Sequence, residues 1–200
     1  TKASSAIGMR AFVPKSSGNP LDRRSAATAE KLFQQLMAQA MLTGDFHGPL
    51  RNFGRDRRGA YGDFLAVNYY RRSTIGVFGE SAMPRSSKND LGWEIYPTGL
   101  ISCCQWLRQI APLPIYITEN GVCDLGDAFR SRFIYEQLRE ISESKLPVKR
   151  YYYRGFTDGF EWLEGSFARF GLVHTDFDTL ERTVKRSGEF YAQIIKEHAV

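Results

Sequence analysis

Glu119 is the carboxylate whose place in the sequence most clearly suggests chemistry. It follows an apolar, β-branched run at residues 114–118 (PIYIT) and precedes Asn120 and Gly121. Taking a carboxylate out of water at the tip of a buried strand is costly unless the group is hydrogen-bonded or used. Glu119 is therefore a candidate functional residue, and the alternative is a surface glutamate in a turn opened by Asn120 and Gly121.

Tyr70 and Asn68 end a second apolar run at residues 63–70 (DFLAVNYY). A phenol can donate a hydrogen bond to an anionic nucleophile and hold it in one rotamer, although a tyrosine taken alone is more typical of a core. Asn68 could donate to a sugar hydroxyl, or its amide could be buried against the backbone. The sequence leaves these two interpretations of Asn68 open.

Glu161 and Trp162 stand together in a glycine-containing stretch after Phe160. An indole face that stacks on a sugar ring, beside a carboxylate that accepts hydroxyl protons, would make a carbohydrate site. The same residues would also suit the start of a helix with a buried tryptophan.

Strand-like and helix-like segments alternate along the chain and would have to position these residues. Strands are expected at residues 7–13, 63–70, 114–118 and 148–156. Helices are expected at residues 29–41, 100–110, 133–141 and 184–198, the first capped by Asp22 and ended by Gly44. Three long loops, at residues 44–62, 71–93 and 158–180, are candidates for function because long loops in compact domains seldom lack one.

This alternation predicts an α/β fold with a parallel sheet and no internal domain boundary over residues 1–200. Four such units are half of a TIM (β/α)8 barrel, or they could form an open doubly wound sheet. The loop at residues 14–20 (PKSSGNP) is not a glycine-rich phosphate fingerprint, and no GxxxxGK[ST] motif occurs. Nucleotide binding is therefore disfavoured. In a barrel, reactive side chains would come from the carboxyl ends of the strands.

Charge and cysteine content narrow the function further. The net charge is +5, but the densest basic stretch, residues 51–58, also contains Asp56, which favours a solvated loop over a nucleic-acid site. Three cysteines without metal-ligand spacing indicate reduced, buried thiols and a cytoplasmic protein. The three histidines are scattered, so no metal or cofactor is expected. No apolar run is long enough to span a membrane.

Taken together, the motifs resemble glycoside hydrolase family 1, the β-glucosidases, β-galactosidases and 6-phospho-β-glycosidases. Residues 63–70 are similar to the family motif DF(I/L)G(L/I)NYY, and residues 92–100 (GWEIYPTGL) to its GWEIYPEGL segment. Residues 114–121 (PIYITENG) match the nucleophile signature. The FEW of residues 160–162, the RFGL of residues 169–172 and a final D–T–R–K–S pattern complete the resemblance; that pattern is Asp176, Thr179, Arg182, Lys185 and Ser187.

The resemblance implies that the chain holds the fifth to eighth strands of the family's barrel. It implies that Glu119 is the catalytic nucleophile, that Tyr70 contacts it and that Asn68 lies in the site. It also implies that Glu161 and Trp162 bind the sugar at the non-reducing end.

Two departures from the family pattern affect this expectation. A retaining glycosidase needs two carboxylates, one as nucleophile and one as acid/base. The family's acid/base lies in an NEP motif, which this chain does not contain. Arg154 also stands where the family has a tryptophan beneath the sugar. An arginine there could clamp an anionic substrate, or it could pair with Glu119 or Glu161 and block stacking.

The main hypothesis is a retaining β-glycosidase that acts on a carbohydrate substrate through a glycosyl–enzyme on Glu119. The acid/base would come from an N-terminal half-barrel, and the exposed sheet edges predict a partner half or self-association. The alternative is a non-catalytic sugar- or protein-binding remnant of the same family. A third interpretation keeps the acid within the chain, at Asp158, Glu161 or Glu164.

Overall fold

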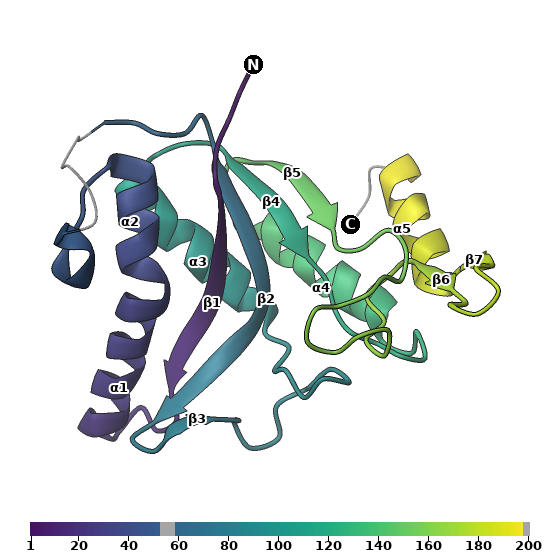
Figure 1. Cartoon of the computed structure of the whole chain (residues 1–200), viewed down its shortest axis with the longest axis horizontal. Coiled ribbons are helices and arrows are strands. Elements are labelled where there is room, and N and C mark those ends of the chain that lie inside the picture. Colours follow the sequence, from purple (N-terminus) through teal and green to yellow (C-terminus); the bar gives the residue numbers. More distant parts are fainter. Residues whose placement is uncertain (53–58, 198–200) are drawn as a thin grey trace.

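The computed structural model describes residues 1–52 and 59–197, in which four parallel strands form the central sheet (Figure 1). The strands are β1 (Ala6–Pro14), β2 (Leu65–Gly76), β4 (Ile115–Asn120) and β5 (Val148–Tyr153), and they lie in the order β1-β2-β4-β5. A short strand, β3 (Gly79–Ser81), folds back antiparallel on the end of β2. Sequential order and parallel pairing are the arrangement that the alternating pattern predicts.

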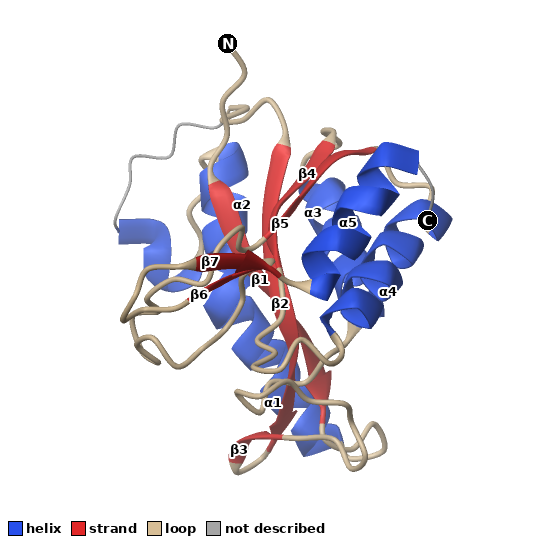
Figure 2. Cartoon of the chain, turned by 90° about the vertical axis from the view of Figure 1, so that its right-hand side faces the viewer, coloured by secondary structure: helices blue, strands red, loops and turns tan. Residues whose placement is uncertain are grey.

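Helices connect successive strands. Between β1 and β2 run α1 (Pro20–Glu30), a π-helical turn η1 (Lys31–Gln35), α2 (Leu36–Thr43) and a 3-10 turn η2 (Gly48–Asn52). The later helices are α3 (Pro97–Ile110), α4 (Arg130–Glu143) and α5 (Arg186–Glu197), and a hairpin of β6 (Val173–Thr175) and β7 (Arg182–Val184) precedes α5. Figure 1 shows α3 and α4 behind the sheet, with α1 and α2 beside β1; Figure 2 gives the view at right angles.

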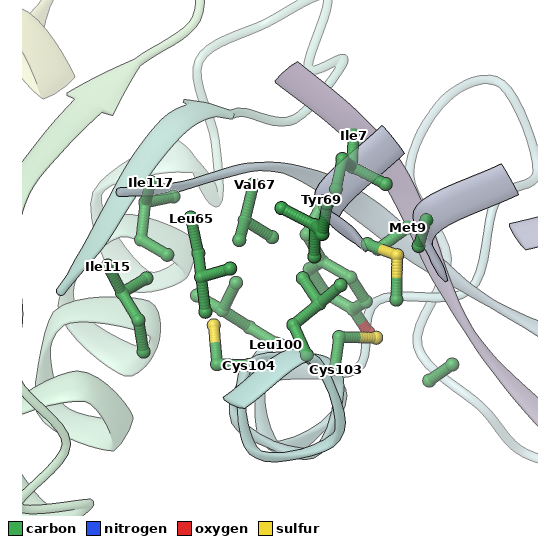
Figure 3. Packing of buried hydrophobic residues seen from close by; sticks show 14 residues of the cluster. Ile7, Met9, Leu65, Val67, Tyr69, Leu100, Cys103, Cys104, Ile115 and Ile117 are labelled. Carbon is green, nitrogen blue, oxygen red and sulfur yellow. The ribbon is translucent and has the colours of Figure 1, made fainter. Parts of the chain in front are cut away.

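The main core lies between the sheet and α3. Alternate side chains of β2 and β4 point to one face, where Leu100, Cys103 and Cys104 of α3 meet them (Figure 3). The strand residues of this face are Leu65, Val67, Tyr69, Ile115 and Ile117, all fully buried. Because side chains alternate along a strand, Asn68, Tyr70 and Thr118 are turned to the opposite, concave face.

The cysteines behave as the sequence predicts. Cys103, Cys104 and Cys123 are free and buried. Burial raises the pKa of the Cys103 and Cys104 thiols, so both stay protonated and pack as apolar groups.

Several predicted boundaries are wrong for physical reasons. The loop expected at residues 71–93 begins and continues partly as strand, because β2 extends to Gly76 and pairs with β3. The strand expected to reach Phe156 ends at Tyr153, and Val184 lies in β7 rather than in the last helix. The first helix is interrupted by the π turn η1, although it ends at Gly44 as predicted, with a φ of 69°.

Asp22 does not cap the first helix. That role belongs to Asn19, whose side chain accepts from the backbone N–H of Leu21. The buried Asp22 carboxylate instead accepts from the N–H groups of Ser16 and Val77, at 3.1 and 2.9 Å. Asp22 therefore ties the loop after β1 to the end of β2.

The basic stretch at residues 51–58 is only partly described. Arg51 is exposed, as a solvated loop would require, and residues 53–58 lie outside the described residues, as does His198. Among the helices in the described part of the chain, none is long and apolar enough to cross a membrane.

Glu94 fixes the extended end of β2 to the loop that leads into α3. Its carboxylate accepts from Arg72 at 3.1 and 3.2 Å, from the Thr74 hydroxyl at 2.7 Å and from the Met83 N–H at 2.6 Å. Burial alone would raise the pKa of Glu94, but these donors outweigh it and lower the pKa to about 2. The carboxylate therefore stabilises the fold in its charged form.

Because the folded pKa of Glu94 is depressed, its contribution is complete above the unfolded value of 4.5 and is lost as pH falls toward 2. We expect Glu94→Gln to lower the free energy of unfolding by roughly 3 kcal/mol at pH 7. The difference from the unsubstituted chain should shrink steadily between pH 5 and pH 2. Urea denaturation at a series of pH values measures it.

Glu143→Gln is the matched control, because Glu143 is exposed and its nearest cation, Arg139, is 3.8 Å away. That variant should follow the unsubstituted chain at every pH. A Glu94→Gln deficit that stayed constant down to pH 2 would contradict the assignment of the charge.

Candidate active site

The end of β4 is held by Asn120, which is fully buried. Its side-chain N–H₂ donates to the Tyr69 carbonyl on β2 at 2.7 Å, and its carbonyl accepts from the Tyr151 hydroxyl on β5 at 2.8 Å. One amide thus links the neighbouring strands on both sides. A Cβ at Gly121 would collide with the Arg154 carbonyl oxygen, so the next residue must be glycine.

Glu119 precedes this amide and projects from the concave side of the sheet. Its register partner on β2 is Asn68, after an irregularity in the ladder. The Tyr70 hydroxyl donates to Glu119 Oε2 at 2.5 Å. Burial and this hydrogen bond raise the pKa of Tyr70 well above its ordinary value, so the phenol remains a donor. The predicted pairing of Tyr70 with Glu119 is present in the structure.

Aromatic rings hold Tyr70 in place. Its ring meets Trp93 and Phe170 edge-on, each with centroids 6.3 Å apart, and Trp93 and Phe170 lie 6.1 Å from each other. Edge-to-face contacts of this kind fix ring orientation. The Tyr70 hydroxyl is consequently aimed at Glu119 by packing, not by the hydrogen bond alone.

Arg154 lies between two carboxylates. Its Nη2 is 3.0 Å from Glu161 Oε2, and its Nε is 3.9 Å from Glu119 Oε2. Burial by itself would lower the pKa of Arg154, but Glu161, Tyr70 and Glu119 raise it. Of the two roles that the sequence left open for Arg154, the structure contains the pairing with Glu161, and the arginine charge is largely satisfied within the chain.

The remaining predicted residues lie around this centre. Asn68 Oδ1 accepts from the Thr118 hydroxyl at 2.6 Å, which leaves the Asn68 N–H₂ available on the concave face. Glu161 sits in a tight turn closed by backbone bonds to Gly165. Trp162 is 93% exposed, so the expectation of a helix start with a buried tryptophan is wrong.

A cleft of about 420 Å³ opens beside Glu119. Asn68, Tyr70, Trp93 and Glu119 line it on the sheet side, together with Arg10 and Arg71. Leu163 and Glu164 reach it from the loop after β5.

Sequence reasoning missed Arg10, Arg71 and Thr118. The available signal was a charge within an apolar strand for Arg10, and adjacency to the two strand ends for Arg71 and Thr118.

The three carboxylates considered as an acid within the chain lie in different surroundings. Asp158 is fully buried and is held by Lys185 at 2.8 Å and Arg169 at 3.6 Å, so its role is structural. Glu161 is paired with Arg154. Glu164 lines the same cleft as Glu119. Within residues 1–52 and 59–197, no cluster of three or more His, Cys, Asp or Glu side chains could hold a metal ion.

Comparisons with known proteins agree with the geometry. A family model described as "Glycosyl hydrolase family 1" matches residues 1–200. The chain is 34% identical over 154 residues to a beta-glucosidase of Agrobacterium sp., a match that covers 66% of this chain and 34% of that protein. It is 27% identical to a beta-galactosidase of Sulfolobus acidocaldarius over 90% of this chain and 40% of that protein.

Solved structures show the same relation. A beta-glycosidase from Pyrococcus horikoshii superposes with a TM-score of 0.84 and 31% identity, covering 96% of this chain and 48% of that one. A beta-glucosidase from Thermotoga maritima in complex with glucoimidazole superposes with a TM-score of 0.85 and 24% identity, covering 100% of this chain and 52% of that one. The expected fold, about half of a TIM barrel, is confirmed. The chain spans between a third and about half the length of these relatives.

Asn120 offers a test of how the site is built. We expect Asn120→Ala to lower the free energy of unfolding by about 3 kcal/mol, because it leaves the Tyr151 hydroxyl and the Tyr69 carbonyl buried without this partner. Urea denaturation measures the loss.

The control is Asn19→Ala, which removes an exposed helix cap and should cost only about 1 kcal/mol. Equal losses of unfolding free energy in the two variants would show that the Asn120 hydrogen bonds do not hold the three strands together.

Proposed function

The chain belongs to glycosyl hydrolase family 1, and on that premise we propose that it supplies the nucleophile of a retaining β-glycosidase, with Glu119 in that role. The observation that carries the proposal is the 2.5 Å hydrogen bond from Tyr70 to Glu119 at the wall of an open cleft. A carboxylate that is held by a hydrogen bond and lines the cleft is suited to attack a bound carbon.

The reaction would run in two steps. A Glu119 oxygen attacks the anomeric carbon while the glycosidic oxygen leaves and takes a proton from an acid. Water, deprotonated by the same group, then attacks the anomeric carbon and releases Glu119. Configuration is retained because the carbon is inverted twice.

Sugar binding is assigned to the residues around Glu119. Asn68 can donate to a hydroxyl with its free N–H₂, and Glu161 can accept from hydroxyls with a carboxylate oriented by Arg154. The exposed indole of Trp162 offers a face for stacking. These roles are part of the proposal.

We place the proton donor in the other half of the barrel, as part of the same polypeptide or as a separate chain. The relatives are two to three times as long as the matched region. β1 and β5 are sheet edges, and apolar side chains beside them are exposed, including Phe33 at 48% and Phe156 at 76%. Covering edges and apolar surface is favourable, so a half-barrel partner or self-association fits both features.

One observation favours a second function, a non-catalytic sugar- or protein-binding role. The Arg154–Glu161 pair lies beside Glu119, where the sugar would have to bind. A bound ligand would need to displace or accommodate that pair. Without a proton donor, the rate would fall by about 10²–10⁴ from the loss of general acid catalysis alone.

The test is covalent trapping. After incubation with a 2-deoxy-2-fluoro-β-glycoside that carries an activated leaving group, intact-mass spectrometry should show one added glycosyl unit. Peptide mapping should place it on Glu119. An activated leaving group departs without protonation, so the experiment reports on the nucleophile independently of the acid.

Two variants sharpen the result. Glu119→Gln should give no adduct, and Tyr70→Phe should form it about 10–100 times more slowly, because the nucleophile loses its fixed orientation. A folded chain that never forms an adduct, alone or with a copurifying partner, would favour the binding role.

A further inference from the structure

Two arginines on the concave face are not used by the proposed reaction. Arg10 on β1 and Arg71 on β2 line the same cleft as Glu119. Neither side chain is fully exposed, so each guanidinium has given up part of its hydration. An interaction that compensates for this lost hydration is therefore expected for each arginine.

The charges of the neighbouring arginines are satisfied within the chain. Arg71 pairs with Glu80 at 2.8 Å and lies 5.5 Å from the Trp93 ring. Arg154 pairs with Glu161. Their role in the cleft is therefore limited by the carboxylates that they already contact.

Arg10 is different. Its guanidinium lies over the Phe33 ring at 4.4 Å, and no carboxylate of the described residues forms an ion pair with it. Burial and then the nearby charge of Arg71 lower the pKa of Arg10, and Glu80 offsets them only in part, so the cation is partly desolvated and repelled. A negative ligand would relieve both costs.

We propose that Arg10, with Arg71 beside it, receives a carboxylate carried by the glycoside, so that acidic substrates are preferred. The planar fork of a guanidinium matches a carboxylate with two parallel hydrogen bonds. Arg10 is the one of these three arginines without a carboxylate ion pair among the described residues, which suits a single negative charge. Glu119 and Glu164 line the same cleft and would repel a phosphate dianion more strongly than a carboxylate.

This inference rests on the proposed glycosidase function, because it assigns a substrate to the same cleft. The carboxylate could belong to the sugar, as in a hexuronide, or to the aglycone. Both would present the same group to Arg10, and two probes distinguish them.

The experiment is isothermal titration calorimetry of the Glu119→Gln chain, which cannot turn over the probes. Methyl β-D-glucuronide is compared with methyl β-D-glucoside, and 4-carboxyphenyl β-D-glucoside with phenyl β-D-glucoside. At least one acidic probe should bind about 10–100 times more tightly than its neutral counterpart. The probe that gains affinity identifies the position of the carboxylate.

Adding Arg10→Met should bring the ratio of acidic to neutral affinities close to one. Arg10→Lys, which keeps the charge without the fork, should retain part of the preference. The backbone of Arg10 is held independently by Gln34, which bonds its N–H at 2.8 Å and its carbonyl at 3.1 Å, so the strand should survive both changes. Arg24→Met removes an exposed charge on α1 and should have no effect.

The inference is overturned if neither acidic probe binds more tightly than its neutral counterpart, if glucose 6-phosphate binds more tightly than both acidic probes, or if the preference survives Arg10→Met. If Glu119 is trapped by the fluoroglycoside but no acid preference exists, the substrate assignment fails and the glycosidase function stands. If the acid preference exists but Glu119 is never trapped, the function fails and the carboxylate site remains.

Discussion

The buried amide of Asn120 is the constraint on which the candidate site depends. It joins the end of β4 to the backbone of β2 at Tyr69 and to the Tyr151 side chain of β5, so the three strands are held in a fixed relation beside Glu119. The ladder between β2 and β4 shifts register after Ile117, so Glu119 pairs with Asn68 and lies on the same side as Thr118, while Asn120 is buried. The same joint brings Tyr70 of β2 within reach of that carboxylate. Without it, the three strands that carry the site would lack this common anchor.

The two faces of the sheet differ because successive side chains along each strand point to opposite faces. Side chains of one parity pack on α3 and make an apolar core, while those of the other parity leave amides, phenols and guanidiniums on the concave face. Glycines at close approaches complete the arrangement. A Cβ at Gly99 would collide with the Tyr69 hydroxyl, and one at Gly171 with the backbone N–H group of Asp158. Gly99 therefore lets α3 approach β2 closely, and Gly171 lets the chain after β5 fold back on Asp158.

Much of this could be predicted from local sequence. Strand and helix order followed from hydrophobic periodicity, whereas the contact of Tyr70 with Glu119 was implied by the family resemblance. The boundaries failed where distant residues decide the structure. β2 is extended because Arg72 and Thr74 donate hydrogen bonds to Glu94, which is twenty residues beyond Thr74 in the sequence. Asp22 does not cap the helix because its carboxylate accepts from the backbone N–H of Val77 instead. Trp162 was ambiguous because exposure depends on a turn whose closure no local pattern reveals.

The cleft itself was the least predictable feature. Arg10 and Glu164 are 154 positions apart in the chain and meet only because the sheet and the final loop enclose one space. Periodicity indicates which face a residue occupies, but not which loop covers that face. The family resemblance supplied the roles of Glu119, Tyr70 and Asn68, and gave no role to arginines at positions where this chain departs from the pattern.

The central claim is that the sheet presents Glu119 as a nucleophile to a sugar bound on the concave face. A crystal structure of the chain, with any copurifying partner, after reaction with the fluoroglycoside tests it most directly. The account predicts continuous density between a Glu119 carboxylate oxygen and the anomeric carbon, with the Tyr70 ring still packed against Trp93 and Phe170. A sugar bonded to another side chain, or bound unreacted away from Glu119, would contradict it.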